Sequence, residues 1–121
     1  MKIISKSAII ESSDSVSAAI NLGQDYQPEI YQVLSMQMPS AWTTAFISFQ
    51  VSYDNKTFVP LYWNNGLYQI TTSGGAAAST GVALEPSAFA GWPYVKVVSG
   101  VPGSLINQAA KREIIFVMGN I

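Results

Sequence analysis

The side chains that could take part in chemistry are seven carboxylates and a set of aromatic rings, because the sequence contains neither histidine nor cysteine. Their absence removes the usual general base at neutral pH, the common nucleophile pairs and the commonest zinc ligands. It also rules out a disulfide framework. We therefore predict that the protein is not an enzyme, and that it uses no cofactor and no metal.

An enzyme built from this inventory would need two carboxylates facing each other across a cleft, as in glycosidases. Asp54 and Glu85 are the acids considered for that role, but both fall in expected turns or strand ends, where a solvated side chain is the better interpretation. A Ca²⁺ site needs several converging oxygen ligands, and only Asp25 and Glu29 form a local cluster that could begin one. We interpret that cluster as an exposed polar turn.

Aromatic side chains are the remaining candidates, since Tyr and Trp offer flat amphipathic surface for stacking on sugars or anchoring protein contacts. We select Trp42, Tyr62 and Trp92 as candidate partner-binding residues. Trp42 and Trp92 stand in loops before expected strands, where a cap over the core is the favoured role and ligand contact is the alternative. Trp63 falls on the apolar side of its strand and is predicted to lie in the core.

The elements that position these side chains are predicted to be β-strands, because apolar residues recur with a period of two. In residues 45–53 the alternation is broken only by Phe46. Further strands are expected at residues 7–10, 16–22, 31–38, 57–63, 67–72, 82–84, 94–99 and 113–119. The side chains expected to face the core are Val16, Ala18, Ile20, Leu22, Leu34, Met36, Met38, Ala45, Ile47, Phe49, Val51, Tyr53, Val59, Leu61 and Trp63.

Turn signals between these runs predict the fold class. Residues 54–56 (Asp-Asn-Lys) and 64–66 (Asn-Asn-Gly) predict hairpins that join three strands into a meander. Residues 113–119 are apolar on both faces and should be central in a sheet, whereas residues 7–10 suit an edge. About eight short strands with little helix, at most one turn at residues 86–90, predict an antiparallel β-sandwich of jelly-roll type.

The chain is expected to form one domain over residues 1–121, since one core suffices at this length. Residues 1–6 are expected to be a flexible N-terminal arm. Residues 71–81 contain only small side chains and are expected to be a loop that is flexible or ordered by a partner.

Charge and hydropathy restrict the classes of partner that the protein could bind. Charged residues make up 11% of the chain and the net charge is −1, against about 25% charged residues in ordinary domains. There is no basic stripe for nucleic acid. No apolar run approaches the ~20 residues that span a bilayer, and no signal peptide is recognisable, so we expect synthesis in a cytoplasm. A weakly charged surface suits packing against other protein.

One stretch of the sequence, residues 49–61 (FQVSYDNKTFVPL), resembles the strand, Ser-x-Asp-Gly turn and aromatic strand of discoidin-like, galactose-binding-type sandwiches, with Asn55 where that pattern has Gly. Such domains are eight-stranded jelly rolls that bind glycans or proteins through their end loops.

Over residues 38–118 the chain resembles small β-sandwich proteins of tailed bacteriophages. The segments that carry this resemblance are residues 39–42 (PSAW), 52–58 (SYDNKTF), 84–86 (LEP), 89–92 (FAGW), 94–100 (YVKVVSG) and 107–112 (NQAAKR).

The phage resemblance implies a structural virion protein made in the host cytoplasm, with capsid decoration (cement) as its role and the major capsid protein as its partner. It also implies a homo-oligomer on the capsid surface, commonly a trimer in such proteins. A glycan-binding module and a fibre or tail accessory domain are the alternatives.

Overall fold

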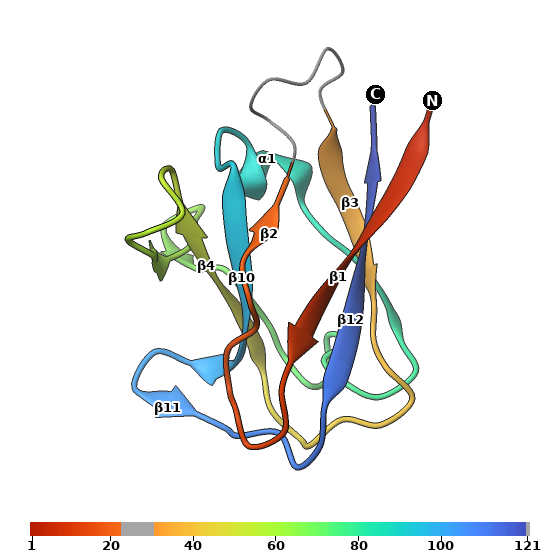
Figure 1. Ribbon diagram of the computed structural model, residues 1–121, viewed down its shortest axis with the longest axis vertical. Helices are drawn as coiled ribbons and strands as arrows, with labels where there is room; N and C mark the ends of the chain where they lie inside the picture. The colour runs from red at the N-terminus through yellow and green to blue at the C-terminus, as the bar shows by residue number, and fades with distance from the viewer. Residues whose placement is uncertain (23–30, 121) are drawn as a thin grey trace.

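Two facing β-sheets carry the fold of the computed structural model, which describes residues 1–22 and 31–120 (Figure 1). The described elements are β1 (Ile3–Ile10), β2 (Ile20–Asn21), β3 (Gln32–Gln37), β4 (Ile47–Ser52), β5 (Val59–Pro60), β6 (Tyr62–Trp63), β7 (Gly66–Leu67), β8 (Gln69–Ile70), β9 (Gly81–Ala83), α1 (Pro86–Phe89), β10 (Tyr94–Val101), β11 (Ser104–Leu105) and β12 (Arg112–Gly119). All described strand pairs are antiparallel. The predicted all-β sandwich with little helix is confirmed, while its jelly-roll strand order stays a prediction.

The first sheet has four strands in the order β1-β12-β3-β9. Its strand β12 is central and β1 lies at an edge, as the sequence predicted. β1 is longer than expected, because it pairs with β12 from Ile3 opposite Gly119 to Ile10 opposite Arg112. The prediction of a flexible arm over residues 1–6 is therefore wrong from Ile3 onward. Ile4 packs against the core and β12 supplies a hydrogen-bonding partner along the whole strand.

A β-bulge in this sheet changes which side chains of β3 face inward. Ser35 lies opposite Val117, but Val33 lies opposite Met118, so one extra residue is accommodated on β3 at Leu34. Such a bulge shifts the alternation by one residue. Met36 is buried as predicted, whereas Val33 takes the buried position expected for Leu34.

The second sheet has six strands, with β11-β10-β4-β5 as its main order, β2 beside β10 and β8 beside β4. Its central strand β4 buries Ile47, Phe49 and Val51 as predicted. Tyr53 was expected to continue that face, but its side chain is 76% exposed. The strand ends at Ser52 and the chain turns there, so the alternation no longer applies.

Residues 16–22 do not form the continuous strand that their alternation predicted. They contain one isolated bridge, Val16 with Val98, and the short strand β2. Ser17 N–H donates to Val97 O (2.9 Å) in one sheet, and Ala18 N–H donates to Ile9 O (3.3 Å) in the other. Because the segment crosses between sheets, Ser17 is buried and Ala18 is exposed, the reverse of the prediction.

Both predicted hairpin turns are present between β4 and β8. Asn64 and Asn65 form the two-residue turn between Trp63 and Gly66 and have positive φ, as such tight turns require. Asn55 also has positive φ, within the longer connection between the paired residues Val51 and Val59. The strands do not form a simple meander, since β5 and β8 both pair with β4 while β6 and β7 form a separate two-stranded sheet.

The segment from β5 to β8 contacts the second sheet along the edge of β4, so few of its side chains can reach the core. Leu61 is buried, and its N–H donates to Phe49 O (2.9 Å). Val59 and Trp63 were also expected to face the core, but they are 45% and 38% exposed.

Residues 71–81 are folded rather than featureless. Ala76 is 1% exposed and belongs to the core. The Thr80 hydroxyl donates to Ala77 O (2.9 Å), and Ser79 N–H donates to Pro39 O (2.8 Å). The prediction of a loop that is flexible or ordered by a partner is therefore wrong, because contacts within the chain hold it and a side chain as small as alanine fits where the backbone approaches the core.

The core lies between the two sheets, where the rings of Phe49 and Phe116 are 6.2 Å apart. Met1 and the last described residue, Asn120, lie together at one end of the sandwich (Figure 1). We call the opposite end, where the β3–β4 connection and the β11–β12 connection lie, the lower end. In the described part of the chain, no helix has the length and apolar character needed to cross a membrane.

Candidate binding surface

The two loop tryptophans selected from the sequence are half-buried and pack against the core. Trp42 also donates its indole Nε1–H to Ala45 O (3.2 Å). They lie at opposite ends of the sandwich, because Ile47, which begins the strand after Trp42, pairs with Ser99 at the far end of β10. Six residues of strand separate the ends by roughly 20 Å. The structure therefore does not bring Trp42 and Trp92 into one site.

Tyr62 is 65% exposed on β6 and is the most accessible of the three predicted residues. Its neighbour Trp63 contacts Tyr68 edge to face, with ring centroids 6.1 Å apart. Tyr68 in turn stacks on Phe49 at 5.7 Å. This aromatic stack connects an exposed indole to the centre of the core.

Tyr68 has a second structural role. Its hydroxyl oxygen accepts a hydrogen bond from Glu85 N–H (2.9 Å). Burial raises the pKa of the Tyr68 phenol; the bond from Glu85 N–H opposes this rise, and the negative charge of Glu85 adds to it. The phenol thus stays neutral and holds the α1 segment to the aromatic stack.

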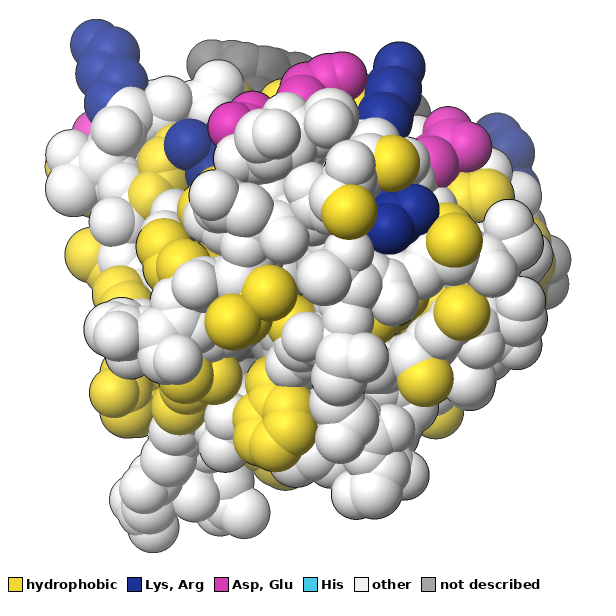
Figure 2. Space-filling view, turned by 90° about the horizontal axis from the view of Figure 1, so that it is seen from below, with side chains coloured by type: hydrophobic (Ala, Val, Ile, Leu, Met, Phe, Trp, Pro, Cys, Tyr) yellow, Lys and Arg dark blue, Asp and Glu magenta, His cyan; other side chains and the backbone are white. Residues whose placement is uncertain are grey.

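The lower end presents a hydrophobic hollow. Phe46, Leu105 and Ile106 are 39%, 50% and 37% exposed there. The hollow has a volume of about 430 Å³ and is lined by Thr44, Ala45, Phe46, Thr72, Gly100, Val101, Ser104 and Ile106. Seen from below, hydrophobic and uncharged side chains cover most of this face, and charged side chains gather toward one margin (Figure 2).

Gly100 shapes this hollow where β10 pairs with β11, opposite Leu105. Its φ is +101°, and a Cβ there would lie 2.4 Å from the carbonyl oxygen of Ser104. Gly100 N–H donates to Phe46 O (2.7 Å), and Ile106 N–H donates to Ser99 O (3.0 Å). Only glycine permits this close approach, which brings Phe46 and Ile106 together.

A buried glutamine fixes the loops of the lower end. Gln108 is 1% exposed. Its Nε2 donates to Thr43 O (3.0 Å) and Ser99 Oγ (2.8 Å), and its Oε1 accepts from Thr43 N–H (2.9 Å) and Arg112 Nε (3.1 Å). Its backbone also exchanges hydrogen bonds with residues 13 and 14. Through its side chain and its backbone, Gln108 therefore joins three connections, β1–β2, β3–β4 and β11–β12.

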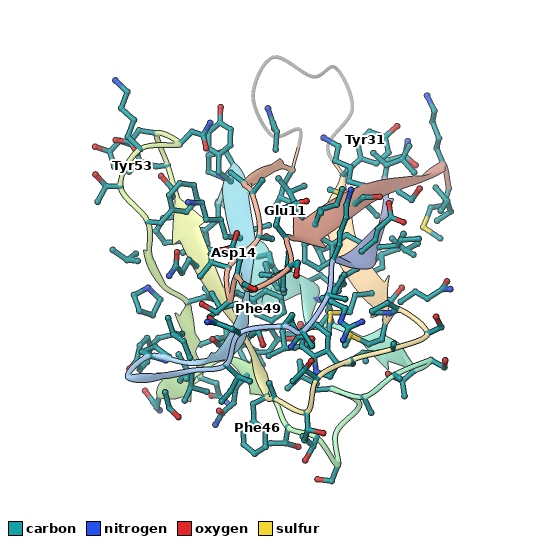
Figure 3. The ribbon with its side chains drawn as sticks, turned by 60° about the horizontal axis from the view of Figure 1, so that its bottom comes forward. Glu11, Asp14, Tyr31, Phe46, Phe49 and Tyr53 are labelled. Atoms are coloured by element: carbon teal, nitrogen blue, oxygen red, sulfur yellow. The ribbon has the colours of Figure 1, made fainter. Side chains whose placement is uncertain are left out.

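Charged side chains lie beside the hollow rather than in it. Glu11 and Asp14 come from the connection between β1 and β2 (Figure 3). Lys111 Nζ lies 4.0 Å from Glu11 Oε1, with both side chains exposed. An exposed pair of this kind contributes little to stability. It supplies a polar rim to a mostly apolar face.

The two carboxylates considered for glycosidase chemistry hold local turns. Asp54 Oδ1 accepts from Lys56 N–H (2.9 Å), Thr57 N–H (3.1 Å) and Ser52 Oγ (2.9 Å). Hydrogen bonds from Thr57, Lys56 and Ser52, in that order, lower the pKa of Asp54. Glu85 Oε1 accepts from Ser87 Oγ (2.7 Å) at the start of α1.

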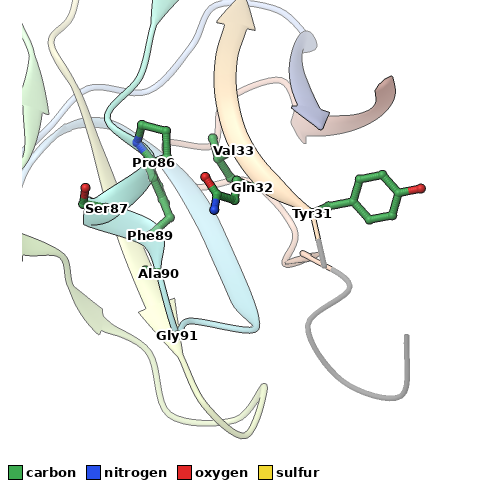
Figure 4. A pocket seen from close by; sticks show the side chains of 8 residues that line it. All are labelled: Tyr31, Gln32, Val33, Pro86, Ser87, Phe89, Ala90 and Gly91. Carbon is green, nitrogen blue, oxygen red and sulfur yellow. The ribbon is translucent and has the colours of Figure 1, made fainter. Parts of the chain in front are cut away.

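A second hollow, of about 330 Å³, lies at the opposite end between β3 and α1 (Figure 4). Its lining residues are Tyr31, Gln32, Val33, Pro86, Ser87, Phe89, Ala90 and Gly91. Among the residues that the structure describes, no charged side chain belongs to that lining. It offers shape and a few hydrogen-bonding groups.

Over residues 1–22 and 31–120, no group of three or more acidic side chains gathers as a metal site would require. The Ca²⁺ cluster considered at Asp25 and Glu29 lies outside the described residues.

The lower-end residues were not predicted from the sequence. Two signals were available: Phe46 breaks the alternation of its strand, and Leu105-Ile106 is an apolar pair inside an otherwise small and polar connection. Comparison with protein-family models, curated proteins and solved structures finds no match to the chain.

Proposed function

We propose that the chain is a structural virion protein, a capsid decoration protein that docks on the outer surface of a phage head through its lower end. The observation that carries this proposal is the hollow lined by exposed Phe46 and Ile106 on a nearly uncharged face, with exposed Leu105 on the adjoining strand β11. The resemblance to small phage β-sandwich proteins supplies the kind of partner, the major capsid protein.

The lower end has the arrangement of apolar and polar residues that is typical of a protein interface. Interfaces combine an apolar centre, often with an aromatic anchor, and a polar rim. Phe46 and Ile106 form such a centre, and Glu11 and Lys111 lie at its margin. The contacts of Gln108 fix the loops before binding, which lowers the entropic cost of docking.

A repeating capsid surface would strengthen weak individual contacts. A decoration protein that forms an oligomer engages several sites at once, and the later contacts become intramolecular. We propose a homotrimer on the strength of the resemblance. Sedimentation should therefore show a species heavier than the 13.0 kDa chain; a monomer at high concentration would contradict this part of the proposal.

The docking test uses Phe46→Ser, with Val59→Ser as the matched control. Both residues are exposed hydrophobic side chains, but Val59 lies on β5, away from the lower end. Purified variants are mixed with undecorated heads and co-sedimented. We expect Phe46→Ser to weaken binding at least about tenfold, which corresponds to ~1.4 kcal/mol, and Val59→Ser to leave it unchanged. Equal binding by both, or absence of the protein from purified virions, would refute the proposal.

Glycan binding is the second candidate, because Tyr62 is the most exposed of the predicted aromatic residues and precedes the Asn64–Asn65 turn. Its ring could stack on a sugar while the amides bind hydroxyl groups. A glycan array with the wild-type protein and Tyr62→Ser tests this. Binding lost in the variant supports the glycan function, and an array without any binder removes it.

A further inference from the structure

The long edge strand β1 offers an open row of backbone hydrogen-bonding groups. Asn120 N–H donates to Lys2 O (3.1 Å) on the β12 side of the strand, whereas Ala18 N–H donates to Ile9 O (3.3 Å) on the opposite side. Because backbone groups alternate along a strand, Ile3, Ser5 and Ser7 direct theirs away from β12. In the part of the chain that the structure describes, these outward groups have no backbone partner.

Lys6 lies in the middle of this open edge. Its side chain leaves the strand on the same face as the buried Ala8 and Ile10, and its Nζ donates to Asn21 O. The ammonium group therefore lies where the two sheets meet, beside the position that an added strand would occupy. A lysine on an edge strand is a device that natural sheets use to control pairing.

The position of Lys6 opposes pairing with a second copy of β1. An antiparallel pair through the open stretch can place Ser5 opposite Ser5, Ser5 opposite Ser7, or Ser7 opposite Ser7. The middle arrangement puts the two Lys6 side chains directly opposite each other, and the other two make them diagonal neighbours. Like charges at such positions destabilise a sheet.

We propose that the edge of β1 binds an extended strand of a partner protein that carries Asp or Glu opposite Lys6, and that Lys6 excludes a second copy of the chain. The backbone groups of Ser5 and Ser7 supply affinity for a strand of any sequence. The charge of Lys6 supplies selectivity, favouring a carboxylate and repelling an ammonium group. This inference concerns a different surface from the lower end and does not depend on a capsid.

The protein itself provides the acidic strand for a test. In a mixture of wild type and Lys6→Glu, pairing with Ser5 opposite Ser7 would place the introduced carboxylate of the variant against the Lys6 ammonium of the wild-type chain. We expect sedimentation to show a mixed species heavier than either protein alone, and its association should weaken as salt is raised because salt screens the attraction between the two charges. Absence of any species heavier than either protein alone would overturn the inference.

Two variants of the Lys6→Glu chain identify the contact. Adding Ser5→Pro removes an N–H that points away from β12, so the strand should remain in its sheet, and we expect at least tenfold weaker mixed association. Adding Ser5→Ala keeps that N–H and should change nothing. Circular dichroism checks that each variant is folded. A mixed species that survives Ser5→Pro would show that β1 is not the contact.

Lys6→Thr is the alternative variant if Lys6→Glu does not fold. It removes the repulsion without adding a charge, so this variant alone should associate with itself while the wild type does not gain mass through β1. Unchanged association in Lys6→Thr would contradict the excluding role of Lys6. Virion binding through the lower end should be the same in all these variants, so the two proposals can fail separately.

Discussion

The lower end and the β5–β8 segment both expose hydrophobic side chains, but they are held in place by different kinds of contact. At the lower end, the buried amide of Gln108 bonds to the backbone of Thr43 and to Ser99. At the β4 edge, the Trp63 ring contacts the Tyr68 ring edge to face, and the Tyr68 ring stacks on Phe49. One region depends on a polar network, and the other depends on ring contacts.

This difference should determine how the stability of each region responds to a substitution. Removing one member of a buried hydrogen-bond network leaves several former partners without hydrogen bonds. Each partner that stays buried then costs free energy. Ring contacts are individually weak and can be lost one at a time. We therefore expect one substitution in the lower-end network to lower the free energy of unfolding by a large amount. A substitution at the β4 edge should lower it by a smaller amount.

Replacing Gln108 with Leu should produce the largest effect. The change leaves Thr43 N–H, Thr43 O and the Ser99 hydroxyl without their partners, at about 1–3 kcal/mol each. We expect the free energy of unfolding, measured in urea, to fall by at least ~3 kcal/mol. Asn107→Ala, at an exposed neighbouring position, is the control and should change little. A loss under ~1 kcal/mol for Gln108→Leu would mean that the network is not what holds the lower end.

Tyr68→Phe should have an intermediate effect at the β4 edge. The ring contacts with Trp63 and Phe49 remain, while Glu85 N–H loses its acceptor. We expect a loss of ~1 kcal/mol in urea unfolding, the net value of one hydrogen bond. Tyr62→Phe removes an exposed hydroxyl and should be neutral. If both variants were equally stable, the bond to Glu85 would contribute nothing.

Asp54→Asn should have the smallest effect, seen as a change in pH dependence. Hydrogen bonds lower the folded pKa of Asp54 below its ordinary value of 3.8. Its contribution is therefore fully present above that value and is lost as the pH falls through the lower, folded pKa. Thermal unfolding from pH 5 to pH 2 should show a shallower decline in the variant. Identical pH profiles would show that this turn does not contribute to acid sensitivity.

The sequence predicted the regular parts of the fold better than its edges. β4, β10 and β12 were recognisable because their apolar faces are buried without interruption. Alternation failed at Leu34 and Ser17, where a bulge and a crossing between sheets shift the register. Both features depend on contacts with distant strands, which a local pattern does not contain.

The candidate binding residues were only partly predictable for the same reason. Exposed Tyr62 was selected from its residue type, and Trp42 and Trp92 pack on the core as the favoured interpretation expected. The lower-end hollow was missed because Phe46 and Ile106 are sixty residues apart in the sequence. The close backbone approach at Gly100 brings them together, and no local signal specifies that approach.

The position of the chain ends matters for using this protein as a scaffold. Met1 and Asn120 lie together at the end opposite the hollow (Figure 1). If the lower end docks on a shell, any peptide or fluorescent domain fused at either end would project outward into the medium. The fold would then serve as an adaptor for displaying cargo on a particle, with the fusion point remote from the attachment point.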